Sequence, residues 1–279
     1  MPFHRARSAV LASAGLAVAA GAAGLWANAR GAPAAQPSAV GSRADDCPPY
    51  PIIETAQERH HAFYFTRGAY TSGRFGWGRR RGRWATDFPK ADRQFLVVLD
   101  RLIGIDSFPC ENLVTLDDPA LRRFPFLYML EVGYMGLTPA EVEGLRSYLL
   151  AGGFLLIDDF WGTEEWANFE YEIRRVLPEY PIVELPLDHE VFRTVYQIKE
   201  VLQVPSIGNV RWGQYWERDG FTPHVRGIFD DDGRLLVGIV WNSDLGDAWE
   251  WAEQPIYPVD RSTFAFQMGI NFIVYSMSH

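Results

Sequence analysis

Two adjacent carboxylates, Asp158 and Asp159, stand directly after the short and uniformly apolar segment Phe154–Ile157. Such a segment is typical of a central strand in a parallel sheet, buried on both faces. Ligands of open α/β sheets bind beyond the carboxyl ends of the strands, so the pair is a candidate for acid–base chemistry or for holding a hard cation. Adjacent side chains on a strand point to opposite faces, so at most one aspartate is expected to face a pocket. Trp161 follows as a candidate ligand contact.

Two further polar residues follow expected strands. Glu131 ends the apolar run Phe126–Leu130, and His189 follows the segment Ile182–Leu185. A histidine beside strand-end carboxylates can act as a base or as a metal ligand. Together with the aspartate pair these residues form the candidate catalytic set. We expect Glu131, one of the two aspartates, Trp161 and His189 to converge on one cavity, where neighbouring carboxylates raise at least one carboxyl pKa. The alternative is that Asp188 caps a helix and His189 is only hydrogen-bonded.

The helix before the apolar segment is predicted by its capping signals. Thr138 and Glu141 form a Thr-x-x-Glu capping box, Pro139 suits the first turn, and Gly152 suits a left-handed exit. Strands alternating with helices indicate βαβ units and a mostly parallel sheet, with an antiparallel addition late in the chain. The same patterns predict further strands at 62–66, 126–130 and 182–185, further helices at 92–103, 164–177 and 262–277, and a hairpin at 227–241.

A Gly- and Arg-rich segment carries a cluster of four arginines, Arg79, Arg80, Arg81 and Arg83, which is unusual in a chain with a net charge of −9. Charge runs are most often solvated loops. The functional alternative is that they bind an anionic lipid, an anionic glycan or an acidic envelope protein. Arg67, after the first expected strand, is a further candidate ligand-binding residue. The net negative charge of the whole chain disfavours nucleic acid as a partner.

No cofactor is expected from the motifs. Asn242, Asp244, Asp247 and Glu250 offer oxygen ligands, but their spacing is not that of an EF-hand, and Asp247 more simply caps a helix. We therefore expect no metal site. Walker, dinucleotide-binding, His-Glu-x-x-His and Cys-x-x-Cys patterns are absent, which leaves nucleotides and structural zinc without support. Gly-x-Cys-x-Gly and Gly-x-Ser-x-Gly are absent too, so no nucleophile elbow is expected.

The N-terminal part of the sequence has the features of a targeting segment followed by a linker. After a basic lead, residues 8–29 carry no charge and are rich in Ala and Gly, which suits a signal-peptide core. An uncleaved membrane anchor is the alternative, because the segment is long enough to span a bilayer. We expect residues 1–35 to be a signal peptide or anchor, 36–58 a linker and 59–279 the domain. The domain is then periplasmic or attached to the inner membrane.

Cys47 and Cys110 are the only cysteines. In an oxidising compartment they can pair and tie the segment after the leader to the domain. Sequence spacing does not fix whether two cysteines lie within bonding distance, so the pairing stays open at this point.

Six stretches of the chain are distinctive: FYFTRGAY (63–70), WATDFPKAD (84–92), FPFLYMLEVGYMGLT (124–138), GGFLLIDDFWGTEEWANFE (152–170), IVELPLDHEVF (182–192) and GIFDDDGRLLVGIVWNSDLGDAWEWAE (227–253). Through them, from about Ala62 to His279, the chain closely resembles a bacterial family known as domain of unknown function 4159. The resemblance implies a fold similar to class I glutamine amidotransferases and ThuA-like proteins, which is a flavodoxin-like three-layer α/β sandwich with a mostly parallel central sheet. The resemblance implies no activity, since none is assigned to the family.

Two hypotheses about function follow. The first is a noncatalytic ligand- or partner-binding domain of the cell envelope, which the missing nucleophile elbow favours. The second is a carboxylate-dependent hydrolase or isomerase acting on a glycan-like substrate, which the strand-end carboxylates favour.

Overall fold

The computed structural model describes residues 47–52, 61–73 and 82–279. All of them belong to the second of two units into which the chain divides, Arg43–His279. The expected leader, most of the expected linker, and Arg79, Arg80 and Arg81 lie outside the described residues. Within the described ranges, no helix combines the length and the hydropathy that crossing a membrane requires.

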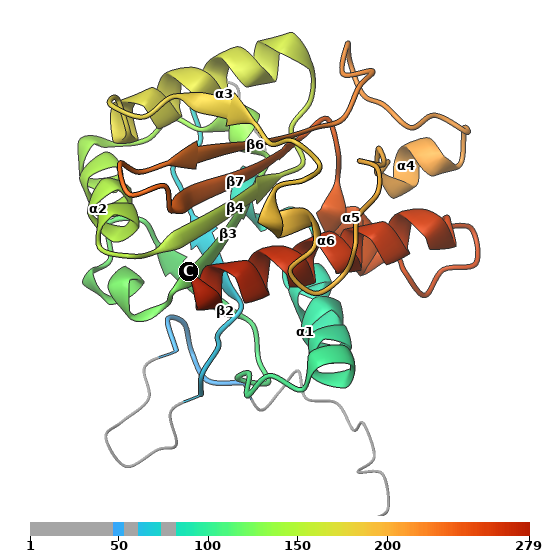
Figure 1. The fold of residues 1–279 in the computed structure, drawn as a ribbon, viewed down its shortest axis with the longest axis horizontal. Coiled ribbons are helices and arrows are strands. Elements are labelled where there is room, and N and C mark those ends of the chain that lie inside the picture. The colour runs from blue at the N-terminus through green and yellow to red at the C-terminus, as the bar shows by residue number, and fades with distance from the viewer. Residues whose placement is uncertain (1–46, 53–60, 74–81) are drawn as a thin grey trace, which may run out of the picture. The chain divides into compact units, whose positions relative to one another are not determined.

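A seven-stranded mixed sheet forms the centre of this unit, in the order β2-β1-β3-β4-β7-β6-β5 (Figure 1). The first five strands in this order run parallel, whereas β6 is antiparallel to both β7 and β5. The predicted α/β class, with a mostly parallel sheet and a late antiparallel hairpin, is confirmed. The strands are β1 Thr66–Ala69, β2 Asn112–Thr115, β3 Phe126–Leu130, β4 Phe154–Asp158, β5 Ile182–Glu184, β6 His224–Phe229 and β7 Leu235–Trp241.

Helices pack on both faces of the sheet (Figure 1). On β3, Tyr128 and its alternate neighbours pack with α1, α5 and α6, whereas Leu127 and Met129 pack with α2 and α3. Successive side chains of β3 point to opposite faces of the sheet, and helices cover both faces, which explains the uniformly apolar sequence of the strand. The helices are α1 Lys90–Ile103, α2 Pro139–Leu150, α3 Gly162–Val176, α4 Ile207–Val210, α5 Leu245–Glu250 and α6 Val259–Ser278, with short 3-10 helices η3 Arg83–Ala85, η4 Pro119–Arg123, η5 Val132–Tyr134 and η6 Glu190–Phe192.

The central βαβ unit has the predicted form. β4 is an interior strand, paired in parallel with β3 on one side and with β7 on the other. The capping box of α2 is present, because Glu141 N donates to Thr138 Oγ1 at 3.2 Å and Thr138 N donates to Glu141 Oε2 at 2.7 Å. Gly152 has a φ of +109°, which fits the predicted exit from the helix.

Some predicted bounds differ from the structure. The first strand is displaced from 62–66 to Thr66–Ala69, since Phe63 forms only an isolated bridge and the ladder with the unpredicted β2 begins at Thr66. Helix α3 starts earlier than predicted, at Gly162. Its first amides donate to Asn242 Oδ1 at 2.8 Å and to Asp219 Oδ1 at 2.9 Å. These caps are remote in sequence, so local capping signals could not locate the helix start.

Cys47 and Cys110 form a disulfide, with their Cα atoms 5.9 Å apart. It ties the segment around residue 47 to the residues just before β2. A second tie is the donation of Ile52 N to Asn112 Oδ1 at 2.8 Å. Because the chain has two cysteines and both are paired, it has no free thiol.

Candidate functional site

The ends of three parallel strands are joined by backbone hydrogen bonds at the carboxyl edge of the sheet. Glu131 N, just after β3, donates to Asp159 O at 3.0 Å, and Asp159 N donates in turn to Ser243 O at 2.9 Å. These hydrogen bonds bring together the residues that follow β3, β4 and β7. A ligand site is expected at this edge of a parallel sheet.

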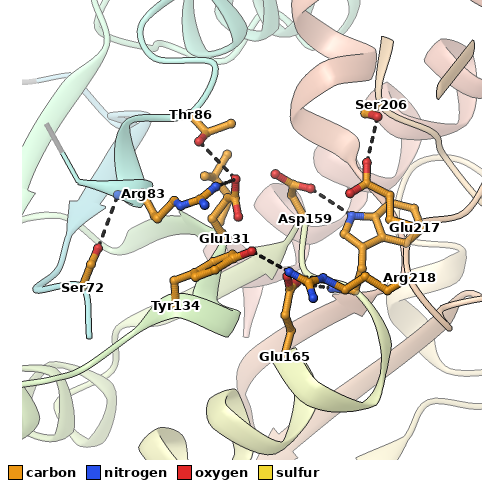
Figure 2. A network of polar contacts seen from close by, with 12 residues as sticks. Ser72, Arg83, Thr86, Glu131, Tyr134, Asp159, Glu165, Ser206, Glu217 and Arg218 are labelled. Carbon is orange, nitrogen blue, oxygen red and sulfur yellow. Dashed lines mark hydrogen bonds and ion pairs between the residues drawn. The ribbon is translucent and has the colours of Figure 1, made fainter. Parts of the chain in front are cut away.

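A pocket of about 190 Å³ opens at these strand ends. Seven carboxylates and two arginines line it, and no aliphatic side chain does. Figure 2 shows Glu131 and Asp159 next to each other in its centre, with Arg83 on one side and Arg218 on the other. The lining residues are Arg83, Thr86, Asp87, Glu131, Tyr134, Asp159, Trp161, Glu165, Ser206, Glu217, Arg218, Asp244 and Asp247.

On the first side of the pocket, Glu131 is held by residues that precede α1. Its Oε1 lies 3.1 Å from Arg83 Nη1 and 3.4 Å from Thr86 Oγ1. The Arg83 guanidinium also lies 4.0 Å from the centre of the Tyr134 ring, where a cation is attracted to the ring face. Burial raises the pKa of Glu131, and the charge of Arg83 opposes that shift.

On the opposite side, Arg218 connects three elements of the pocket wall (Figure 2). Its Nε lies 2.8 Å from Glu165 Oε1 on α3, and its Nη2 donates to Tyr134 Oη at 2.7 Å. The other oxygen of Glu165 accepts from Trp161 N at 2.6 Å. Glu217 is fixed by Ser206, whose hydroxyl donates to Oε1 at 2.8 Å. These contacts hold the wall in place before any ligand arrives.

The two adjacent aspartates have separate surroundings. Asp159 lines the pocket, and its Oδ1 accepts from Trp161 Nε1 at 3.0 Å. Asp158 does not line it; its Oδ2 accepts from Leu245 N at 2.6 Å and from Gly246 N at 3.2 Å, at the start of α5. Burial raises the pKa of Asp158 to about 7. Burial, followed by the charges of Glu131 and nearby aspartates, raises the pKa of Asp159 well above its usual range.

Three more aspartates complete the buried side of the pocket. Carboxylate oxygens of Asp87, Asp159 and Asp244 lie within 4.8 Å of one another. Asp244 caps α5 by accepting from Asp247 N at 2.7 Å. Burial raises the pKa of Asp247 to about 6, and burial together with neighbouring aspartates raises those of Asp87 and Asp244 well above their usual range. This carboxylate group is suited to share protons or to hold a cation.

The backbone is strained around the pocket. Five non-glycine residues of the described ranges have a φ between +49° and +60°, and four of them line the pocket. Asp87 and Asp159 are of a type that tolerates this left-handed region, but Glu131 and Arg218 are not. Each such residue costs about 1–3 kcal/mol, and backbone strain of this kind concentrates at functional sites. The fifth residue, Asn242, caps α3 beside the pocket.

The remaining candidate residues from the sequence lie elsewhere. The Arg67 side chain is fully buried and paired with Asp92, outside the pocket lining. His189 caps η6, accepting from Val191 N at 3.3 Å, and burial lowers its pKa. Among the residues expected to converge, the structure brings Glu131, Trp161 and one aspartate of the pair, Asp159, to one pocket, but His189 does not line it.

Sequence reasoning missed several lining residues. Asp87 and Glu165 lie inside stretches that carry the family resemblance, WATDFPKAD and GTEEW, but nothing local marks them as facing a site. Glu217 and Arg218 come from a segment without periodicity or motif. Asp244 and Asp247 were singled out as oxygen ligands or caps, and the structure shows that both line the pocket.

Stability is expected to fall as pH rises from about 5 to about 7.5 when no cation is added. Asp247 and Asp158 have folded-state pKa values of about 6 and about 7, above the ordinary value of about 3.9. The folded protein therefore binds more protons than the unfolded chain in this window, and each proton lost with rising pH costs stability. Thermal melts across the window measure the slope. Asp158→Asn should reduce the slope. Asp118→Asn should leave the slope unchanged, because Asp118 caps a helix outside the pocket. A wild-type melting temperature that does not change across the window would contradict the raised pKa values of Asp158 and Asp247.

The fold and the site thus define an α/β protein whose pocket lies at the carboxyl ends of its parallel strands. The chain belongs to the family described as domain of unknown function (DUF4159), whose model matches residues 72–277. No curated protein matches the chain.

Proposed function

We propose that this protein is an exported envelope protein whose acidic pocket binds a small, hydroxyl-rich ligand such as a sugar unit, without performing chemistry on it. The observation that supports this most directly is the placement of four strained residues, Asp87, Glu131, Asp159 and Arg218, around one pocket. Strain of this kind is maintained where function requires a fixed geometry. The absence of a free thiol removes the nucleophile that amidotransferase-like relatives would need.

The lining supports a hydroxyl-rich ligand over other classes. Pockets for drug-like molecules are mostly apolar and reach about 300–1,000 Å³, whereas this one is smaller and without aliphatic side chains. Seven carboxylates against two arginines disfavour an anionic ligand. Carboxylates accept hydrogen bonds from hydroxyl groups, and Arg83 and Arg218 can donate to ligand oxygens.

The proposal also covers fold family and location. The three-layer packing and the sheet order support a flavodoxin-like, class I amidotransferase-like fold for the proposed domain, 59–279. The uncharged stretch 8–29 and the Cys47–Cys110 disulfide support export to the periplasm or the outer side of the inner membrane, after a leader within 1–35 and a linker at 36–58. Fractionation and N-terminal sequencing test this, and an intact Met1 in a cytoplasmic pool would contradict it.

Glu131→Gln is expected to weaken binding of a monosaccharide about 10- to 100-fold, because a hydrogen bond to a charged group contributes about 1.5–3 kcal/mol. Isothermal titration with glucose, galactose and N-acetylglucosamine measures the affinity. The matched control is Glu179→Gln, which breaks an exposed ion pair with Arg146 away from the pocket and should leave affinity unchanged. If none of the three sugars binds the wild-type protein, or if the two variants behave alike, the sugar-binding proposal fails.

A second candidate function is carboxylate-dependent hydrolysis or isomerisation of a glycan-like substrate. The observation in its favour is that burial, together with the nearby charge of Glu131, raises the pKa of Asp159, which places a proton-holding carboxyl beside a second carboxylate. Release of reducing ends from an oligosaccharide, abolished in Asp159→Asn, would support this function over simple binding.

The Arg79, Arg80 and Arg81 cluster stays a prediction from the sequence as the contact for an envelope protein, an anionic glycan or an anionic lipid. Pull-downs with and without these charges test it, and unchanged partners would remove the cluster from the proposal.

A further inference from the structure

We propose that Asp87, Asp159 and Asp244 together bind one Ca²⁺ ion at the buried side of the acidic pocket. The proposal deepens the proposed function, since the ion would lie in the same pocket and offer its open coordination positions to ligand hydroxyls. The three residues come from separate segments: before α1, after β4 and before α5. Their convergence is therefore a property of the fold and not of a local acidic run.

The spacing of the oxygens fits calcium. One carboxylate oxygen from each residue lies within 4.8 Å of the other two. Ca²⁺ binds oxygen at 2.3–2.6 Å, so oxygens on opposite sides of one ion are about 4.6–5.2 Å apart, and neighbouring ones are closer. Mg²⁺ usually keeps several waters and is held through one or two carboxylates, whereas Ca²⁺ accepts several carboxylates in a flexible geometry. A group of three carboxylates therefore fits Ca²⁺ better than Mg²⁺.

Asp87 supplies an observation independent of the cluster. Its Oδ2 is shielded from solvent and accepts no hydrogen bond among the described residues. A buried carboxylate oxygen without a donor is costly, because the desolvated charge is not compensated. Gly246 makes room for this oxygen, as a Cβ at that position would lie 2.7 Å from it. Asp87 lines the pocket, so a cation bound there would supply a partner for its carboxylate.

Asp159 and Asp244 each keep an oxygen for coordination. Trp161 Nε1 uses one oxygen of Asp159, and Asp247 N uses one of Asp244. These hydrogen bonds fix the orientation of both carboxylates, as ligands of a metal site usually require.

Calcium is expected to raise the melting temperature of the full chain in a saturable way, with a midpoint near the 0.1–1 mM that is typical of extracellular modules. The titration uses CaCl₂ at constant ionic strength and contains no sugar, so its outcome does not depend on the proposed ligand. Asp159→Asn and Asp244→Asn should abolish the calcium-induced shift. The melting temperature of each variant in EDTA shows that it folds, since the amide oxygen of the new asparagine can keep the existing hydrogen bond.

Asp118→Asn is the matched control, since Asp118 also caps a helix by accepting from a backbone amide, at 2.7 Å, outside the pocket. It should keep the full response to calcium. A second measurement uses Tb³⁺, whose luminescence should be excited through Trp161, 3.0 Å from Asp159 Oδ1, and displaced by Ca²⁺.

The proposal is overturned if calcium changes neither the melting temperature nor the Tb³⁺ signal, or if Asp159→Asn and Asp118→Asn respond alike. Stronger stabilisation by Mg²⁺ than by Ca²⁺ would overturn the assignment to calcium. Calcium binding without sugar binding would leave this inference standing and defeat the proposed function, so the two failures are distinguishable.

Discussion

Replacing Arg67 by methionine is expected to lower the free energy of unfolding by about 3–5 kcal/mol. Arg67 and Asp92 are both fully buried, with Arg67 Nε 3.2 Å from Asp92 Oδ1 and a second contact between Nη2 and Oδ2. Arg67 Nη1 also donates to the backbone oxygens of Trp84 and Thr86, at 3.3 and 3.1 Å. Without the guanidinium, Asp92 would remain as an unpaired buried carboxylate, and two backbone acceptors next to the pocket would lose their donor.

Urea unfolding of the purified protein measures this loss, and the control is the double variant Arg67→Met/Asp92→Leu. Removing both partners should restore most of the stability, because no unpaired charge stays buried. Burial raises the pKa of Asp92, so in the single variant the stability should improve toward low pH as this carboxyl takes up its proton. A single variant as stable as wild type at pH 7 would show that the pair carries no such role.

Loss of the Cys47–Cys110 disulfide is expected to cost about 4 kcal/mol, the value that the chain-entropy model gives for a loop of this length. The cysteines are 63 residues apart, and the bond restricts the unfolded chain over that span. The double variant Cys47→Ser/Cys110→Ser, compared with oxidised wild type by urea unfolding, measures the effect.

Reduced wild-type protein is the control for this variant and should match it within about 1 kcal/mol, because both lack the same cross-link. If wild type loses no stability on reduction while its thiols become reactive, the disulfide contributes nothing to holding the domain together.

The sequence was informative where the deciding interactions are local. The capping box of Thr138 and Glu141 and the buried strand Phe154–Ile157 rest on neighbours within a few residues, and the structure has both. The position of Glu131 at a strand end was predictable for the same reason. The partner of Arg67 was not, since Asp92 lies 25 residues away and an arginine in a sequence is ordinarily an exposed residue.

The pocket itself was only partly predictable. Strand-end residues such as Asp159 follow from the topology of a parallel sheet. Arg218 and Glu217 reach the pocket from an irregular segment whose course depends on tertiary contacts, including the ion pair between Arg218 and Glu165. No periodicity encodes such a path. The place of Asp87 in the pocket was equally unpredictable, because it depends on the path of the chain between η3 and α1.

The left-handed backbone at Glu131 and Arg218 has a consequence for the evolvability of this protein. Glycine adopts that conformation without steric cost, so a laboratory selection for heat tolerance alone would gain backbone stability from glycine at Glu131, and at Arg218 once the partner Glu165 is also replaced by a neutral residue. Each such gain would delete a charged group from the pocket wall. Heat tolerance and ligand recognition therefore compete at the same residues, and variants improved in one property should be recovered impaired in the other.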